Sequence, residues 1–156
     1  MYNWNNIQSY WEQENRKWNL IPMPYSNQIK TILNGIEKII ESEFNIPVGK
    51  SGNEYFMIEP ISDDLIENLH GGQSRSYSVR VSYTMIKAGH FETNRNHLTN
   101  RAERMKRLLF NNTAYDDDGY VWHDGRVNGI TYEQDEDNQE IYRALIEFSC
   151  TKQESI

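Results

Sequence analysis

The chain has 156 residues, of which 37% are hydrophobic and 25% charged, and this length allows one domain with a core of useful size. Its 10 Tyr, 5 Phe and 4 Trp supply enough apolar surface for folding, which a disordered chain lacks. The formal net charge of -7, with no block rich in Lys or Arg, argues against a general electrostatic grip on nucleic-acid phosphates. The single cysteine, Cys150, excludes an internal disulfide and indicates a reducing compartment.

Neither a membrane helix nor a signal peptide is predicted from the sequence. No apolar run approaches the roughly 20 residues that a membrane helix needs. The first residues, rich in Asn, lack the basic start and apolar middle of a signal peptide. We therefore expect a soluble protein made in the cytosol, with no membrane partner.

Residues 1–24 are predicted to form an N-terminal aromatic arm. Trp4, Trp11 and Trp18 are spaced seven residues apart, so on a helix they form one aromatic stripe. The stripe either packs on the parent domain or lies in a neighbouring subunit, where Trp is an efficient anchor. Pro22 and Pro24 make it unfavourable for that helix to continue, so a boundary is expected there.

The most regular helical pattern follows the arm, over residues 25–44. Ser26 is placed to cap the first turn, and Pro47 disfavours helix just beyond the end. Gly35 inside the helix costs about 1 kcal/mol relative to Ala and indicates close packing. The residues that recur at intervals of three and four are Ile29, Ile32, Leu33, Ile36, Ile39 and Ile40.

A short apolar run over residues 54–60 predicts a strand. The connection over residues 61–74 is long and ends in flexible glycines, so we expect a projecting loop and not a tight turn. Loops of this kind often carry function, which makes this one a candidate for partner contacts. The residues singled out there are Asp63, Asp64, Gly71 and Gly72.

The pattern over residues 74–110 changes from strand to helix within one unit. Residues 75–86 alternate with period two, which is typical of a half-buried antiparallel strand. Residues 93–110 then follow a period near 3.6, so this helix is expected to lie across a sheet that contains the strand. The predicted buried faces are formed by Tyr77, Val79, Val81, Tyr83 and Met85 of the strand, and Leu98, Ala102, Met105 and Leu109 of the helix.

The last third of the chain is predicted to form strands separated by acidic turns. Residues 120–123 and 126–133 are expected to be extended on either side of a turn at Asp124 and Gly125. A last strand over residues 140–151 is expected to pair with residues 129–133 as a hairpin. The sequence thus predicts one α+β domain over residues 25–151, with an antiparallel sheet of four to five strands on two main helices, and a short tail over 152–156.

No pattern for catalysis, metal binding or cofactor binding stands out. The four histidines lack metal-ligand spacing, and there is no nucleophile turn or dinucleotide fingerprint. His123 and Asp124 could serve as a base and its orienting acid, but adjacent strand residues point to opposite faces. We therefore expect no enzymatic activity, no metal and no cofactor.

The order of elements resembles the tail terminator family of long-tailed bacteriophages, small proteins that cap the tail tube and form the joint to the head. The resemblance rests on the helices over 25–44 and 93–110, the strand over 75–86, and the closing pair over 126–133 and 139–151, roughly two thirds of the chain. It is a likeness of layout, size and strand character. The aromatic arm and the connection before residue 75 go beyond the family's minimal pattern.

This resemblance implies a structural virion protein that forms a six-membered ring on the tail tube. Its implied partners are further copies of itself, the tail tube protein and a head-side connector or neck protein. DNA would pass through without being bound specifically, and an acidic bore would repel its phosphates. The implied location is the tail-neck region of a virion that is assembled in the host cytoplasm.

Two alternatives stay open at this point. The first is a neighbouring neck or head-closure protein, and the second is a small hydrolase that uses carboxylates and His123. For the tail terminator, the residues expected to contact subunits or partners are Trp4, Trp11, Trp18, Asp63, Asp64, Gly71 and Gly72.

Overall fold

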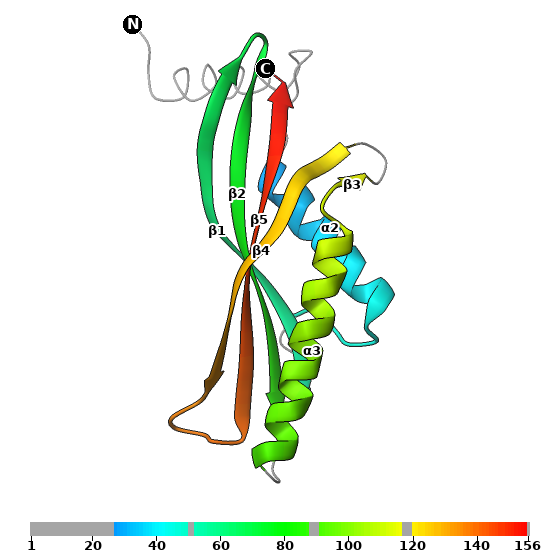
Figure 1. Cartoon of the computed structure of the whole chain (residues 1–156), viewed down its shortest axis with the longest axis vertical. Coiled ribbons are helices and arrows are strands. Elements are labelled where there is room, and N and C mark those ends of the chain that lie inside the picture. The colour runs from blue at the N-terminus through cyan, green and yellow to red at the C-terminus, as the bar shows by residue number, and fades with distance from the viewer. Residues whose placement is uncertain (1–26, 50–51, 88–90, 117–119, 156) are drawn as a thin grey trace, which may run out of the picture.

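The computed structural model describes residues 27–49, 52–87, 91–116 and 120–155. In this part of the chain, two helices lie on a five-stranded antiparallel sheet of strand order β1-β2-β5-β4-β3, which confirms the predicted α+β fold. Figure 1 shows a long, strongly twisted sheet with both helices beside it. The predicted arm with Trp4, Trp11 and Trp18 lies outside the described residues.

Helix α2 spans Gln28–Glu43 and confirms the predicted helix, with a different cap. The N-cap is Asn27, whose side-chain Oδ1 accepts a hydrogen bond from the backbone N–H of Lys30 at 3.2 Å. The proposed cap Ser26 lies outside the described residues. At the other end the backbone N–H of Phe44 donates to the carbonyl of Ile40 at 2.8 Å, and the chain leaves in an extended conformation.

The predicted loop over residues 61–74 was wrong, because this segment forms two strands. Strand β1 spans Glu54–Leu69 and strand β2 spans Gly72–Ile86, and they pair from Glu54 opposite Met85 to Leu69 opposite Gly72. Two irregularities in β1 shift the pairing, between Pro60 and Ser62 and between Leu65 and Glu67. The connection is thus a tight turn at the tip of a long hairpin.

Helix α3 spans Phe91–Asn111 and buries the four residues predicted for its inner face. The five alternating residues predicted for the inner face of β2 are also buried, each at 3% exposure or less. Helix α2 adds Ile32, Ile36 and Ile40, so both helices and one face of the sheet share a single core.

Strand β4 spans Tyr120–Gln134 and corrects a second prediction, because the expected turn at Asp124 and Gly125 is a bulge within one strand. Asp124 adopts a positive φ of 51°. The backbone N–H of Gly125 turns out of the ladder and donates to the carbonyl of Thr113 at 2.7 Å, just before the short strand β3 (Tyr115–Asp116). The bulge therefore connects β4 to the end of α3.

Strand β5 spans Ile141–Ser155 and occupies the centre of the sheet, between β2 and β4. The predicted hairpin with β4 is confirmed, with Ile130 opposite Ile146. The strand continues past residue 151 and pairs with β2 up to Ser155, opposite Gly72. Most of the predicted tail is therefore part of the sheet.

Candidate functional site

The first candidate surface is the far end of the β1–β2 hairpin, residues 61–78, which we call the distal hairpin. Figure 1 shows it running past the ends of both helices. Strand β1 lies at the edge of the sheet. Its outer backbone groups bond to Pro47 and Gly49 at Phe56, but within the described residues no strand lies beside its distal half. Four large apolar side chains of this strand are solvent-exposed: Ile61 at 46%, Leu65 at 49%, Ile66 at 54% and Leu69 at 36%.

The distal hairpin is acidic. Asp63 is neutralised by Arg75 of the opposing strand, whose Nε lies 2.6 Å from Oδ1 and whose pKa is raised by this hydrogen bond. Asp64 and Glu67 are exposed, lie opposite Ser76 and Ser74, and form no ion pair within the described part of the chain. The hairpin therefore combines exposed aliphatic side chains with two carboxylates that form no ion pair among the described residues.

The structure brings four of the predicted contact residues together in this hairpin. Asp63 and Asp64 lie on β1 beside the exposed aliphatic side chains, while Gly71 forms the turn and Gly72 begins β2. Gly71 has a φ of 85°, a conformation that L side chains rarely adopt, so its role is to close the turn. Whether these residues contact a partner stays a prediction, as it does for the three tryptophans.

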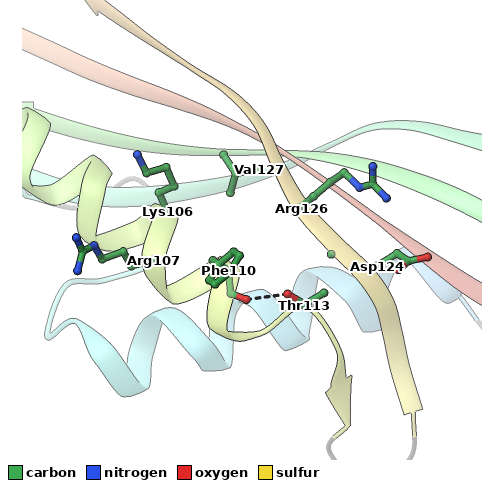
Figure 2. A pocket seen from close by; sticks show the side chains of 8 residues that line it. Lys106, Arg107, Phe110, Thr113, Asp124, Arg126 and Val127 are labelled. Atoms are coloured by element: carbon green, nitrogen blue, oxygen red, sulfur yellow. Dashed lines mark hydrogen bonds between the residues drawn. The ribbon is translucent and has the colours of Figure 1, made fainter.

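The second candidate surface, which sequence reasoning missed, is a cleft of about 510 Å³ between the end of α3 and the bulge of β4. Figure 2 shows the Phe110 ring between these two elements. Phe110 is 75% exposed, a large value for an aromatic ring in this position. This Phe110 cleft is lined by Lys106, Arg107, Phe110, Thr113, Asp124, Gly125, Arg126 and Val127.

The Phe110 cleft carries positive charge on an acidic chain. Lys106 is paired with Glu103 at 2.7 Å. Arg107 and Arg126 are exposed and have no ion-pair partner among the described residues. Asp124 is the one carboxylate among the lining residues, and Figure 2 shows the Arg107 and Arg126 side chains pointing outward from the two walls, so their charges lie at the rim of the cleft.

Backbone contacts fix the shape of the cleft. The Thr113 hydroxyl donates to the carbonyl of Phe110 at 2.7 Å, and the carbonyl of Thr113 in turn accepts from Gly125. A Cβ at Gly125 would lie 2.9 Å from Cζ of Phe148 and 3.0 Å from the Thr113 carbonyl oxygen. The bulge of β4 is thus held tightly against the end of α3.

A polar cluster ties β1, β2 and α3 together near the other end of the core. Glu54 accepts a hydrogen bond from the Tyr83 hydroxyl and lies 3.3 Å from Nε of Arg101 and 3.5 Å from Nε2 of His97. Burial alone would raise the pKa of Glu54, but the Tyr83 hydrogen bond and the charge of Arg101 outweigh it, so the pKa falls. Burial, followed by the bond to Glu54, raises the pKa of Tyr83.

This cluster works as a structural tie. Its carboxylate is engaged by three side chains from two other elements, which fixes the position of α3 on the sheet. His123 and Asp124, the pair considered for a hydrolase, do not belong to this cluster. They lie in the bulge of β4, where His123 is opposite Thr151.

Other kinds of site find no support within the described residues. They contain no group of three or more His, Cys, Asp or Glu side chains placed to hold a metal ion. No described helix is long and apolar enough to cross a membrane. Cys150 is 2% exposed in strand β5, and burial raises the pKa of its thiol to about 12, so it packs there as a small apolar residue.

Comparison with known proteins gives a structural match only. No family model matches the sequence, and no curated protein matches it significantly. Among solved structures, a chain from the virion of a native gene transfer agent (GTA) particle matches with a TM-score of 0.61 at 10% sequence identity. The match covers 83% of this chain and 100% of the other. The likeness shows that the two chains have the same fold.

Proposed function

We propose that this chain is a structural protein of a phage-like virion, which caps the tail tube as a ring and joins the tail to the head-side connector. The observation that carries the proposal is the likeness to a virion chain over that chain's whole length. It agrees with the layout of helices and strands that resembles the tail terminator family. This role requires neither catalysis nor a cofactor.

The two candidate surfaces support a ring. A closed ring needs two different patches on each subunit, because each copy contacts the next head to tail. The distal hairpin and the Phe110 cleft differ in charge and shape, and they lie toward opposite edges of the sheet. The proposed partners are further copies of the chain, which together form a six-membered ring, the tail tube protein, and a head-side connector or neck protein.

A neck or head-closure protein is the second candidate, because the same fold likeness supports any structural position in such a virion. The two functions differ in what the ring binds. A terminator binds the end of the tail tube, whereas a head-closure protein binds the head connector first. Both place the chain in the tail-neck region of the virion.

The test measures the mass of the full chain by light scattering over a concentration series, both alone and with purified tail tubes from the same virion. A terminator is expected to form a species near six times the 18.5 kDa of one chain, alone or on tubes. Electron microscopy of gold-labelled protein then shows whether it sits at the tube end. A chain that stays monomeric and ignores tubes contradicts the terminator function, and binding only to the connector favours the neck position.

A further inference from the structure

We propose that the distal hairpin of one copy docks on the Phe110 cleft of the next copy, and that this contact builds the ring. The inference rests on the proposed function and names the residues through which subunits recognise one another. Its occupant is a second copy of this chain, because the chain itself carries both halves of a complementary pair.

Charge is the first part of that complementarity. Asp64 and Glu67 of the distal hairpin have no salt-bridge partner, and neither do Arg107 and Arg126 of the Phe110 cleft, among the residues that the structure describes. On a chain of net charge -7, two arginines at the rim of one cleft are a specific target for an acidic segment. Pairing these groups across an interface would steer the hairpin to the cleft and set its register.

Apolar surface is the second part. Ile61, Leu65 and Ile66 are each at least 46% exposed on the hairpin, and Phe110 is 75% exposed in the cleft. The cleft has a volume of about 510 Å³. A docked hairpin would remove these side chains from water, with the charged pairs at the rim, as in other protein interfaces.

The position of the two surfaces allows a ring to close. Strand β1 forms one edge of the sheet, whereas β4 lies two strands beyond β2 toward the other edge. Figure 1 shows the hairpin and the end of α3 on opposite sides of β5. Since one copy therefore offers its hairpin on one side and its cleft on the other, the contact is heterologous and can repeat around an axis.

Charge reversal tests this contact. One full-length variant carries Asp64→Lys and Glu67→Lys on the hairpin, and a second carries Arg107→Glu and Arg126→Glu in the cleft. Each variant alone would place like charges across the contact, so the dissociation constant for self-association is expected to rise at least ~100-fold in sedimentation velocity. All four positions are exposed, and thermal unfolding is expected to show that both variants remain folded.

A one-to-one mixture of the two variants gives the decisive measurement. In an alternating ring, every lysine hairpin meets a glutamate cleft and every aspartate-glutamate hairpin meets an arginine cleft, so assembly is expected to return. The matched control carries Glu136→Lys and Glu140→Lys at the exposed β4–β5 turn, the same change in charge as in the hairpin variant, and is expected to assemble as the wild type does. Loss of assembly in the control as well would mean that net charge alone decides association, which overturns the contact.

The outcomes separate this inference from the proposed function. Normal rings in both single-surface variants would overturn the hairpin contact and leave the terminator function intact. Variants that fail to assemble alone and also fail as a mixture would likewise overturn it. A wild-type chain that remains monomeric with and without tail tubes overturns both.

Discussion

Among the described glycines, Gly35 is the one at which packing leaves the least room for a side chain. A Cβ there would lie 2.7 Å from Cζ3 of Trp122 and 3.0 Å from Cε1 of Tyr115. Trp122 has no space to yield, because it is fully buried, stacks on Tyr115, contacts Phe148 edge-on and donates through Nε1 to the Asn112 carbonyl. The sequence indicated close packing at this glycine, and the structure confirms it.

We predict that Gly35→Ala destabilises the protein despite the better helix propensity of alanine. The helix gains about 1 kcal/mol from the substitution, whereas overpacking against Trp122 costs about 1–3 kcal/mol. The expected net loss in the free energy of unfolding is up to about 2 kcal/mol, measured by urea denaturation. Gly129→Ala is the control, because no atom lies within 4 Å of a Cβ there. Equal stability of Gly35→Ala and wild type would show that α2 can move away from β4.

Glu54 makes the stability of the protein depend on pH. Its folded-state pKa is lowered from 4.5, so its contribution is present above that pH and is lost as the pH falls through the folded value. We predict that Glu54→Gln lowers the free energy of unfolding at pH 7 by about 1 kcal/mol. This is the contribution of a hydrogen bond to a charged group, reduced because Glu54 is partly exposed to solvent. The difference from wild type is expected to shrink below pH 4.5.

The measurement for Glu54 is urea denaturation of both proteins at several pH values. Glu136→Gln, at an exposed position of the β4–β5 turn, is the control and is expected to match the wild type throughout. A constant difference between Glu54→Gln and wild type from pH 7 to low pH would mean that packing of the side chain, and not its charge, ties β1 to α3.

At the scale of the elements, the helices and the central strand could be predicted because their burial leaves a regular period in the sequence. Ile32, Ile36 and Ile40 repeat every four residues and all are fully buried. Tyr77 to Met85 alternate without interruption because β2 has a neighbour on both sides and a helix layer on one face. A periodic environment produces a periodic sequence.

The elements that could not be predicted are those in which bulges break the period. Two irregularities in β1, after Pro60 and Leu65, destroy the alternation that would have revealed the distal half of this strand. The bulge at Asp124 and Gly125 likewise has the composition of a turn, although the strand continues. The Phe110 cleft left only one signal, an aromatic residue next to the apolar face of α3, because its other wall comes from β4 and is brought near by the fold.

The N-terminal arm is expected to contribute to assembly of the ring. We predict that deleting residues 1–20, or replacing Trp4, Trp11 and Trp18 with Ala, weakens the ring and leaves the domain folded. Tryptophans are efficient anchors when they enter a neighbouring subunit. Light scattering measures the oligomer and circular dichroism the fold. Unchanged oligomer size and unchanged tail joining would mean that the stripe packs on its own domain.

At the scale of the whole molecule, the net charge of the chain and the arginines of the Phe110 cleft have opposite effects on DNA binding. A ring around a DNA passage works best if it does not hold the phosphates, and a net charge of -7 repels them over a distance of about 10 Å at moderate salt. Lys106 of the Phe110 cleft is already paired with Glu103, which leaves Arg107 and Arg126 without an ion-pair partner among the described residues, fewer than the 6–10 phosphate contacts of tight, salt-sensitive DNA binding.

We therefore predict that the full chain does not bind mixed-sequence duplex DNA at about 50 mM salt, measured by fluorescence anisotropy. The long-range repulsion acts on the entire polyanion, whereas the cleft attracts it only at one place, so repulsion is expected to win. Binding that disappears in the Arg107→Glu and Arg126→Glu variant but persists in the Asp64→Lys and Glu67→Lys variant would contradict this. The cleft would then be a site for phosphates, and its cations would not be available to hold the hairpin of a neighbouring subunit.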